Sequence, residues 1–232
     1  MIAVIDYGAG NIFSVKNALD FLGMENRITS SAKDIESADA VILPGVGAFP
    51  KAMDMLEKSG LIETIQIQAR KKPFLGICLG MQLLFDKGYE FEACDGLGLI
   101  EGKVKKMEEP ELIIPHMGWN KLEILNDCPL LCGLEENSYV YFVHSYKAEC
   151  NDKNISAYSV YGGKVPALVY DGGTVYGAQF HPEKSGEVGL KILKAFCEFI
   201  CCRFQRCTIQ TEINIRFFCP FLTNFIQMTH YF

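Results

Sequence analysis

Residues 73–80 read Pro73-Phe74-Leu75-Gly76-Ile77-Cys78-Leu79-Gly80, an apolar run that ends in a cysteine flanked by two glycines. A short apolar run of this kind is typical of a strand that is buried on both faces of a parallel sheet. The glycines permit a tight turn that larger side chains would block. The stretch therefore predicts a buried strand, a sharp turn that carries Cys78, and a helix that begins at Gly80 and extends over 80–85.

Further strand and helix patterns surround this stretch. On its N-terminal side, apolar runs alternate with helical patterns; the runs are 2–7, 26–29 and 40–43, and the helical patterns are 12–22 and 51–70. On its C-terminal side most patterns are extended, and they cover 97–107, 121–125, 139–146, 155–161 and 165–180, before a last helix that starts near Ser185. Strands that alternate with helices predict a sheet with helices on both faces. We therefore expect one α/β domain with a mixed, mostly parallel sheet.

The composition is that of a globular enzyme. The 232 residues are 49% hydrophobic and 22% charged, and 28 acidic against 22 basic side chains give a net charge of −6. Without a basic run, nucleic acid and membrane surfaces are not expected as partners. The first residues lack the pattern of an export signal, so we expect a cytoplasmic protein with reduced thiols. The spacing of the ten cysteines does not match a zinc site, and we expect neither metal nor cofactor.

The last 32 residues differ in composition from the rest of the chain. Residues 201–232 hold four of the ten cysteines and carry a net charge of +2, so residues 1–200 carry −8. Pro220 and scattered polar residues leave no sustained hydrophobic period. We expect a domain over 1–200 and an unassigned tail over 201–232. The tail either covers a surface or has no folded role, and the missing period favours the second interpretation.

Cys78 is a candidate nucleophile, because its setting is the thiol form of the Gly-x-Ser-x-Gly nucleophile elbow. A start of a helix at this point favours the thiolate. The alternative is a buried cysteine at the end of a glycine-rich strand. A nucleophile needs a base, and His181 follows an apolar strand at the edge where sheets of this type keep their sites. In an extended chain Glu183 points to the same side and can orient His181, although an isolated His-x-Glu is more often a surface loop.

Two further segments fit such a site. Pro44-Gly45-Val46-Gly47 follows a predicted strand, and its backbone N–H groups could bind an oxyanion together with the amide of Leu79, unless it is an ordinary turn between a strand and a helix. Gln82 lies four residues after Cys78, on the same helix face, where it either binds the polar end of a substrate or faces solvent.

Two more side chains are left open by their patterns. His144 alternates with apolar neighbours, which favours packing over catalysis. Trp119, the only tryptophan, is either a core anchor or an interface anchor.

Taken together, Gly-Ile-Cys-Leu-Gly-Met-Gln at 76–82 and Gln-Phe-His-Pro-Glu at 179–183 resemble the triad-type (class I) glutamine amidotransferases. Other strings resemble one branch of that family, the glutaminase subunits that supply ammonia for imidazole glycerol phosphate synthesis; these strings are 6–11, 43–49, 115–120, 141–146 and 181–185. The resemblance covers residues 1 to about 200. It implies a class I glutamine amidotransferase-like fold.

The resemblance also implies roles for individual residues. Cys78 would attack the carboxamide of glutamine and form a glutamyl thioester, His181 would transfer protons, and Glu183 would orient His181. The oxyanion and glutamine sites implied by the resemblance consist of Gly45, Val46, Gly47, Leu79, Gln82, Ser145 and Tyr146. No metal enters this chemistry.

A partner is implied as well, because a glutaminase domain uses the whole matching region. In this branch the partner is a cyclase subunit, a (β/α)8 barrel that receives ammonia in a heterodimer during histidine biosynthesis. The positions that resemble its interface are Asn11, His116, Met117, Trp119 and Lys184.

Three other functions compete with this one. They are a paralogous subunit that supplies ammonia to a different synthase, such as a sugar-amidating enzyme, a cysteine hydrolase or peptidase, and a non-catalytic binding subunit. Gln82 and the loop at Gly45–Gly47 count against the hydrolase or peptidase. The presence of all three triad residues counts against the binding subunit.

Overall fold

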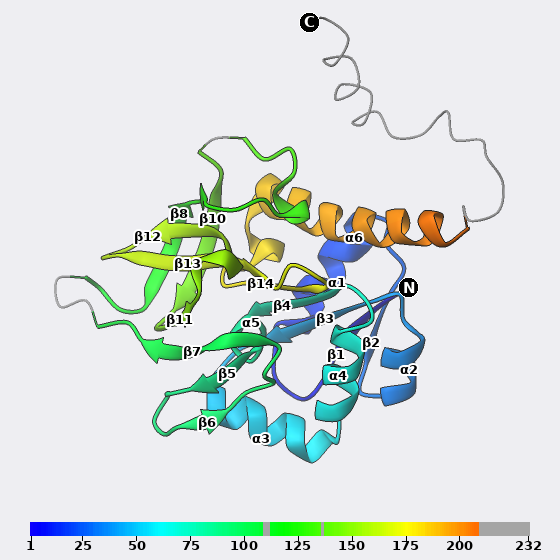
Figure 1. Cartoon of the computed structure of the whole chain (residues 1–232), viewed down its shortest axis with the longest axis horizontal. Helices are drawn as coiled ribbons and strands as arrows, with labels where there is room; N and C mark the ends of the chain where they lie inside the picture. Colours follow the sequence, from blue (N-terminus) through cyan, green and yellow to red (C-terminus); the bar gives the residue numbers. More distant parts are fainter. Residues whose placement is uncertain (109–111, 136, 209–232) are drawn as a thin grey trace, which may run out of the picture. The chain divides into compact units, whose positions relative to one another are not determined.

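The computed structural model describes residues 1–108, 112–135 and 137–208, and the chain divides into two units, Met1–Ile200 and Cys201–Phe232. The tail predicted over 201–232 lies largely outside the described residues, so its role stays a prediction. The first unit contains three sheets and the helices that cover them (Figure 1). Within the described part of the chain, no helix combines the length and the apolar character that crossing a bilayer requires.

The central element is a mixed eight-stranded sheet. Its strands are β1 (Ile2–Ile5), β2 (Asn26–Thr29), β3 (Ala40–Gly45), β4 (Phe74–Cys78), β9 (Glu123–Ile124), β12 (Ile155–Val160), β13 (Lys164–Tyr170) and β14 (Val175–Ala178). They lie in the order β2-β1-β3-β4-β14-β13-β12-β9. The first five strands in this order run parallel, and the other three are antiparallel to their neighbours. The α/β fold with a mixed sheet is thus confirmed.

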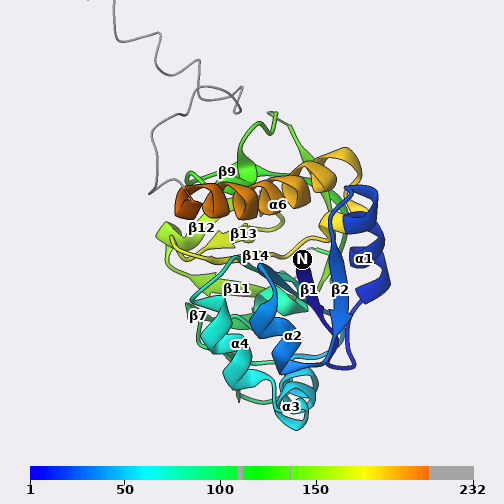
Figure 2. The same cartoon turned by 90° about the vertical axis from the view of Figure 1, so that its right-hand side faces the viewer.

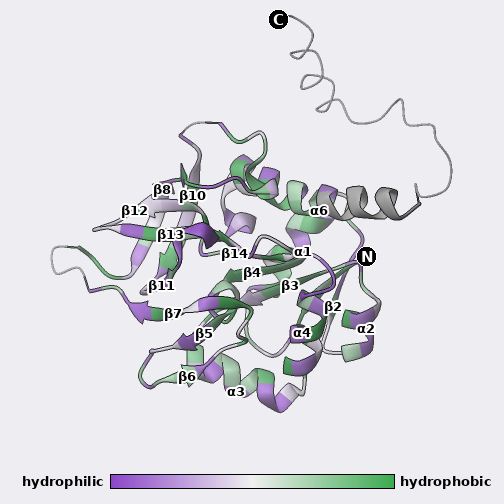
Figure 3. Ribbon diagram, viewed as in Figure 1, coloured by the Kyte–Doolittle hydropathy of each residue, from purple (hydrophilic) through white to green (hydrophobic). Residues whose placement is uncertain are grey.

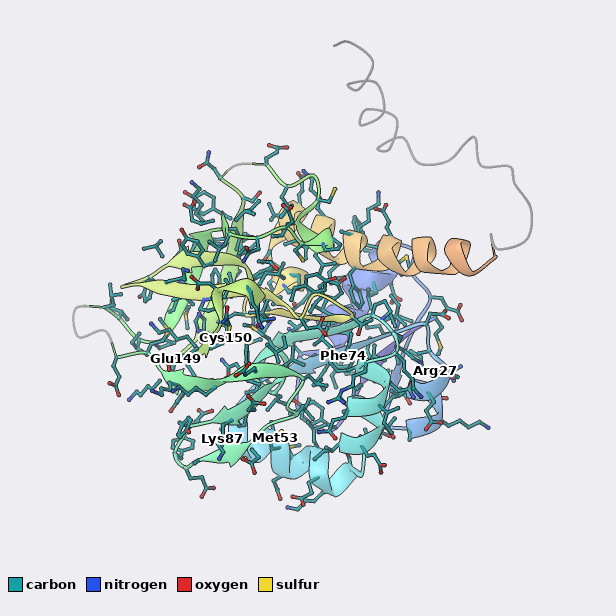
Figure 4. All side chains as sticks on the ribbon, in the orientation of Figure 1. Arg27, Met53, Phe74, Lys87, Glu149 and Cys150 are labelled. Atoms are coloured by element: carbon teal, nitrogen blue, oxygen red, sulfur yellow. The ribbon has the colours of Figure 1, made fainter. Side chains whose placement is uncertain are left out.

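Helices cover both faces of this sheet (Figure 2). One core lies under α1 (Ile12–Phe21) and α6 (Gly186–Thr208), where Val15 and Phe196 are fully buried. The other lies under α2 (Ala32–Ser37), α3 (Phe49–Ser59) and α4 (Ile62–Ala69). The adjacent strands β1, β3 and β4 carry no charged side chain and are buried along their whole length (Figure 3), and Phe74 at the start of β4 is fully buried in the interior (Figure 4).

Two smaller sheets complete the unit. The four-stranded sheet has the order β11-β7-β5-β6 and consists of β5 (Phe85–Gly88), β6 (Cys94–Asp95), β7 (Ile100–Lys106) and β11 (Tyr146–Cys150). The two-stranded sheet pairs β8 (His116–Lys121) with β10 (Tyr139–His144) in antiparallel orientation. The short 3₁₀ helices are η1 (Pro129–Leu131), η2 (Asp152–Asn154) and η3 (Pro182–Lys184).

Two predicted helices differ from the structure. The single helix predicted over 51–70 is wrong, because α3 ends at Ser59 and the following Gly60, with a left-handed φ of 68°, stops the helix before α4 begins. The helix predicted over 80–85 is short: α5 spans Leu79–Gln82 and the chain then enters β5. Pairing of β5 with β6 and β7 overrides the local helical pattern there.

Close backbone packing holds α5 against the neighbouring strand. A Cβ atom at Gly80 would lie 1.9 Å from the carbonyl oxygen of Leu43 in β3, and one at Gly76 would lie 2.5 Å from the carbonyl oxygen of Gly80. The neighbouring atoms are backbone and cannot move aside as a flexible side chain would. Only glycine therefore fits at these two positions, and the turn after β4 depends on both.

We expect Gly80→Ala to destabilise the chain, since the added methyl group overlaps Leu43. Overpacking of this kind costs about 2–3 kcal/mol, which lowers the melting temperature of a domain of this size by roughly 4–12 °C. Differential scanning calorimetry measures the change. Gly173→Ala is the matched control, because its Cβ atom would meet only the Asp171 side chain, at 3.4 Å. Equal melting temperatures for both variants would contradict the packing account.

Candidate active site

Cys78 occupies a strained turn between β4 and α5. Its φ of 56° and ψ of −112° lie outside the regions that non-glycine residues ordinarily adopt. Such a conformation costs about 1–3 kcal/mol and is found mainly at functional sites. The register pairs Cys78 with Gly45 in β3 and Ile77 with Ala178 in β14, so three strand ends meet around the thiol.

His181 and Glu183 come directly after β14. His181 Nδ1 lies 2.8 Å from Oε1 of Glu183, and both side chains are almost completely buried. The sequence predicted this contact from an extended chain, but the structure forms it through the 3₁₀ turn η3 after an extended His181. Because a carboxylate only accepts, Nδ1 carries the proton, and Nε2 is left for the other side of the ring.

The other partner of His181 is Cys78. Burial by itself would lower the pKa of His181, but hydrogen bonds to Cys78 and Glu183, together with their charges, raise it to about 9. The imidazole thus connects the Cys78 thiol with the Glu183 carboxylate. A thiol, an imidazole and a buried carboxylate in this order can generate a nucleophile and move its proton.

Residues Gly45–Gly47 at the end of β3, called the glycine loop below, lie beside the turn at Cys78. A Cβ atom at Gly45 would lie 2.6 Å from the backbone nitrogen of Gly80, so this glycine permits a close approach of the loop to α5. Gly47 has a φ of 100° and nothing within 4 Å of its Cβ position, and Val46 is 43% exposed. The loop is therefore packed against α5 at Gly45, whose Cβ position lies 3.0 Å from Cβ of Leu79, and it is open at Gly47.

Gln82 is buried rather than solvent-facing, with 5% of its surface exposed. Its side-chain nitrogen donates to the carbonyl oxygen of Tyr146 and to Oε1 of Gln179, both at 3.0 Å. Both amide hydrogens are then used, which leaves Oε1 of Gln82 to accept from a ligand. The Ser145 carbonyl accepts from the Met107 amide at 2.9 Å. Segment 145–146 thus borders Gln82.

The sequence analysis missed two polar side chains in this region. Gln179 is fully buried, and its Nε2 has no hydrogen-bond partner among residues 1–108, 112–135 and 137–208. The Tyr7 hydroxyl lies 2.9 Å from the Cβ position of Gly45, and burial together with the charge of Cys78 raises its pKa. The sequence did hold a signal for Tyr7. It ends the apolar run 2–7, and Gly45 follows the apolar run 40–43, so two parallel strands would bring both residues to the same edge of the sheet.

The predicted interface residues fall into two groups. Met117 and Trp119 on β8 are 61% and 56% exposed, and Lys184 is also exposed, while Asn11 is half-buried. Trp119 is therefore not a core anchor; its ring meets Tyr141 edge to face. His116 differs from the others because its side chain is buried behind this surface, with 3% exposed. It cannot touch a partner directly in this conformation.

Known proteins are similar to this chain in sequence and in fold. The model of the class-I glutamine amidotransferase family matches residues 3–198. The chain belongs to the class-I glutamine amidotransferases. It is 53% identical over 197 residues to the imidazole glycerol phosphate synthase subunit HisH of Bacillus thuringiensis (strain Al Hakam), covering 84% of this chain and 93% of that protein.

A second relative and a solved structure extend the comparison. HisH of Listeria monocytogenes serotype 4a (strain HCC23) is 53% identical over 200 residues, covering 85% of this chain and 95% of that protein. The structure of PurLQS from Thermotoga maritima matches with a TM-score of 0.67 at 22% identity, covering 86% of this chain and 98% of that one. This likeness concerns the fold of the amidotransferase domain.

We expect Cys78→Ala to lower the pKa of His181 from its wild-type value of about 9, because burial is then opposed by Glu183 alone. The protonated His181 ring stabilises the folded chain. This contribution is complete below pH 6.5, the ordinary pKa of histidine, and is lost as the pH rises through the raised pKa of about 9. Titration of the imidazole by NMR measures the shift. Cys128→Ala, which removes an equally buried cysteine, is the control. An unchanged pKa of His181 in Cys78→Ala would show that Cys78 does not contribute to the raised pKa of this ring.

Proposed function

We propose that this amidotransferase is the glutaminase subunit of an imidazole glycerol phosphate synthase. It hydrolyses glutamine to glutamate and passes ammonia to a cyclase subunit, a (β/α)8 barrel, in a cytoplasmic heterodimer of histidine biosynthesis. The observation that carries this proposal is the 53% identity to HisH proteins, which extends over 93–95% of their length. Support also comes from the three strand ends that bring Cys78, His181 and the glycine loop together.

The chemistry begins with the Cys78 thiolate and a charged His181. The sulfur attacks the side-chain carbonyl carbon of glutamine, a carbon–sulfur bond forms, and the carbonyl electron pair moves to oxygen. When this tetrahedral adduct collapses, the carbon–nitrogen bond breaks and His181 gives its proton to the departing nitrogen. Ammonia leaves, and a glutamyl thioester remains on Cys78.

Hydrolysis then restores the enzyme. Neutral His181 takes a proton from water, the hydroxide attacks the thioester carbon, and the carbon–sulfur bond breaks to release glutamate and the thiolate. Glu183 keeps the proton on Nδ1 throughout, so that Nε2 faces the reacting atoms. The developing oxyanion is held by the amide of Leu79 and by backbone N–H groups of Gly45, Val46 and Gly47.

Binding of glutamine is assigned to the wall beside this centre. Gly47, Gln82, Ser145 and Tyr146 hold the amino-acid end of the substrate. Since both hydrogens of the Gln82 amide are already used, its Oε1 accepts from the ammonium group of glutamine. The carboxamide end then reaches Cys78, which lies one helical turn before Gln82.

The partner surface is assigned to the exposed side of β8 with its neighbours. Met117 and Trp119 are large exposed hydrophobic residues on one strand, and Asn11 and Lys184 add polar groups. Aromatic anchors with a polar surround are typical of protein interfaces. The competing function, supply of ammonia to a different synthase such as a sugar-amidating enzyme, uses the same triad and differs only in the partner.

With the cyclase subunit present, we expect Cys78→Ala to abolish synthesis from glutamine and to leave synthesis from added ammonium salt within about twofold of wild type. The reason is that only the glutamine route requires the thiol. Product formation is followed by absorbance or chromatography for each nitrogen source. Cys128→Ala serves as the control for loss of a buried thiol. Loss of both activities in Cys78→Ala would contradict the ammonia-donor role.

We expect Trp119→Ala to weaken binding of the cyclase subunit by roughly 30-fold or more, since truncating a central aromatic anchor costs about 2 kcal/mol or more. Isothermal titration calorimetry measures the affinity. Ile67→Ala on α4 is the control, because Ile67 is also exposed, at 41%, but lies on the helix layer under the opposite face of the sheet. If both variants bind like wild type, the partner surface lies elsewhere.

A further inference from the structure

Two buried histidines lie outside the triad. His116 on β8 and His144 on β10 are cross-strand partners, 3% and 6% exposed, and Nδ1 of His116 lies 3.0 Å from Nε2 of His144. The His116 ring is stacked between Phe142 and Tyr161, with centroids 4.6 Å and 4.0 Å away. The proposed reaction uses neither ring, although both lie between the partner surface and the glutamine site.

The inner end of this pair fixes the direction of its hydrogen bonds. His144 Nδ1 lies 2.8 Å from the carbonyl oxygen of Tyr146, and a carbonyl only accepts, so Nδ1 of His144 carries the hydrogen. In a neutral ring Nε2 of His144 is then the acceptor, and Nδ1 of His116 must be the donor. Nε2 of His116 is left as an acceptor.

The outer end requires the same direction independently. The Asn120 side-chain oxygen accepts from the Lys121 amide at 2.8 Å, and its nitrogen donates to the carbonyl of Val160 at 3.1 Å. These bonds orient the amide so that its nitrogen faces Nε2 of His116 at 3.3 Å, where it meets an acceptor. Both ends thus agree on one continuous chain of donors from Asn120 to the Tyr146 carbonyl.

This chain requires two neutral rings. A proton added to either ring would place two N–H donors opposite each other, at the contact with Asn120 or at the contact between the rings. Burial lowers the pKa of both histidines to about 4, and for His144 the charges of His116, His181 and Lys147 act in the same direction. The bond from His144 to Tyr146 opposes this shift without reversing it.

The chain ends on the atom that orients Gln82. The Tyr146 carbonyl accepts from His144 and from the Gln82 amide, which also donates to Gln179. We propose that His116 and His144 are positioning residues for glutamine: they hold the Tyr146 carbonyl, and through it they keep Oε1 of Gln82 turned toward the substrate. This inference rests on the proposed function, since it concerns the same glutamine site.

The test separates binding of glutamine from the reactivity of Cys78. The full chain is labelled with 6-diazo-5-oxo-L-norleucine, a glutamine analogue that alkylates a cysteine at a glutamine site, and saturation of the labelling rate gives KI and kinact. Iodoacetamide, which does not resemble glutamine, reports the intrinsic reactivity of Cys78. For His144→Leu we expect KI to rise about tenfold, as for loss of one buried hydrogen bond, with kinact and the iodoacetamide rate within about threefold of wild type.

Conservative variants distinguish positioning from packing. In His144→Asn the side-chain nitrogen replaces Nδ1 as donor to Tyr146, so we expect KI to return to within about 1.5-fold of wild type. His116→Phe keeps the stacking on Phe142 and Tyr161 but removes the donor to His144, and we expect KI to rise about threefold. Asn154→Ala is the matched control, because it removes a buried side-chain bond to the backbone, to Tyr170, away from the glutamine site.

The outcomes can be told apart. A wild-type chain that the analogue does not label in a saturable way overturns the proposed function and this inference with it. Saturable labelling of wild type, with equal KI values for His144→Leu and His144→Asn, overturns only the positioning role. The same conclusion holds if His144→Leu does not fold and both His116→Phe and His144→Asn keep the wild-type KI.

Discussion

The structure depends on the close contact between α5 and β3, where only glycine fits at position 80 against the Leu43 carbonyl. This contact forces the chain to turn sharply at the end of β4, and the turn gives Cys78 its positive φ. The strain is stored at one residue and is balanced by the packing of the surrounding strands. Because β3, β4 and β14 end together at this point, the contact also sets the position of the glycine loop and of His181 relative to the thiol.

Three buried histidines show how partners decide the charge of a ring. His181, His116 and His144 are 2%, 3% and 6% exposed, so burial disfavours the charged form in all of them. His181 has a pKa of about 9 because a thiol and a carboxylate face its two nitrogens. The other two have pKa values of about 4, because burial dominates there and the Tyr146 carbonyl, which accepts from His144, opposes it only in part. The roles proposed here in proton transfer and in positioning thus fall to the same residue type in different surroundings.

The sequence predicted those parts that depend on local pattern. The apolar run before Cys78, its two glycines, and the strand before His181 place these residues at strand ends without knowledge of distant contacts. Features that depend on long-range pairing were not predictable in this way. The helix pattern after Gly80 gave way to β5, because that strand pairs with β7, and β8 was missed because it forms through its pairing with β10, which lies farther along the chain. The burial of His116 follows from that pairing: side chains alternate along β8, and the register with β10 decides which set faces inward.

The two-stranded sheet connects the proposed partner surface with the site along two separate routes. Trp119 contacts Tyr141 on the neighbouring strand, and the Tyr141 carbonyl accepts from the backbone N–H of His181 at 3.0 Å. His116, on the inner side of the same strand as Trp119, starts the route to Tyr146 and Gln82. In the described part of the chain, β8 and β10 pair only with each other and not with the eight-stranded sheet. A displacement of this pair would therefore leave the backbone ladders of the main sheet intact, yet it would reach the hydrogen bonds of His181 and of Tyr146 together.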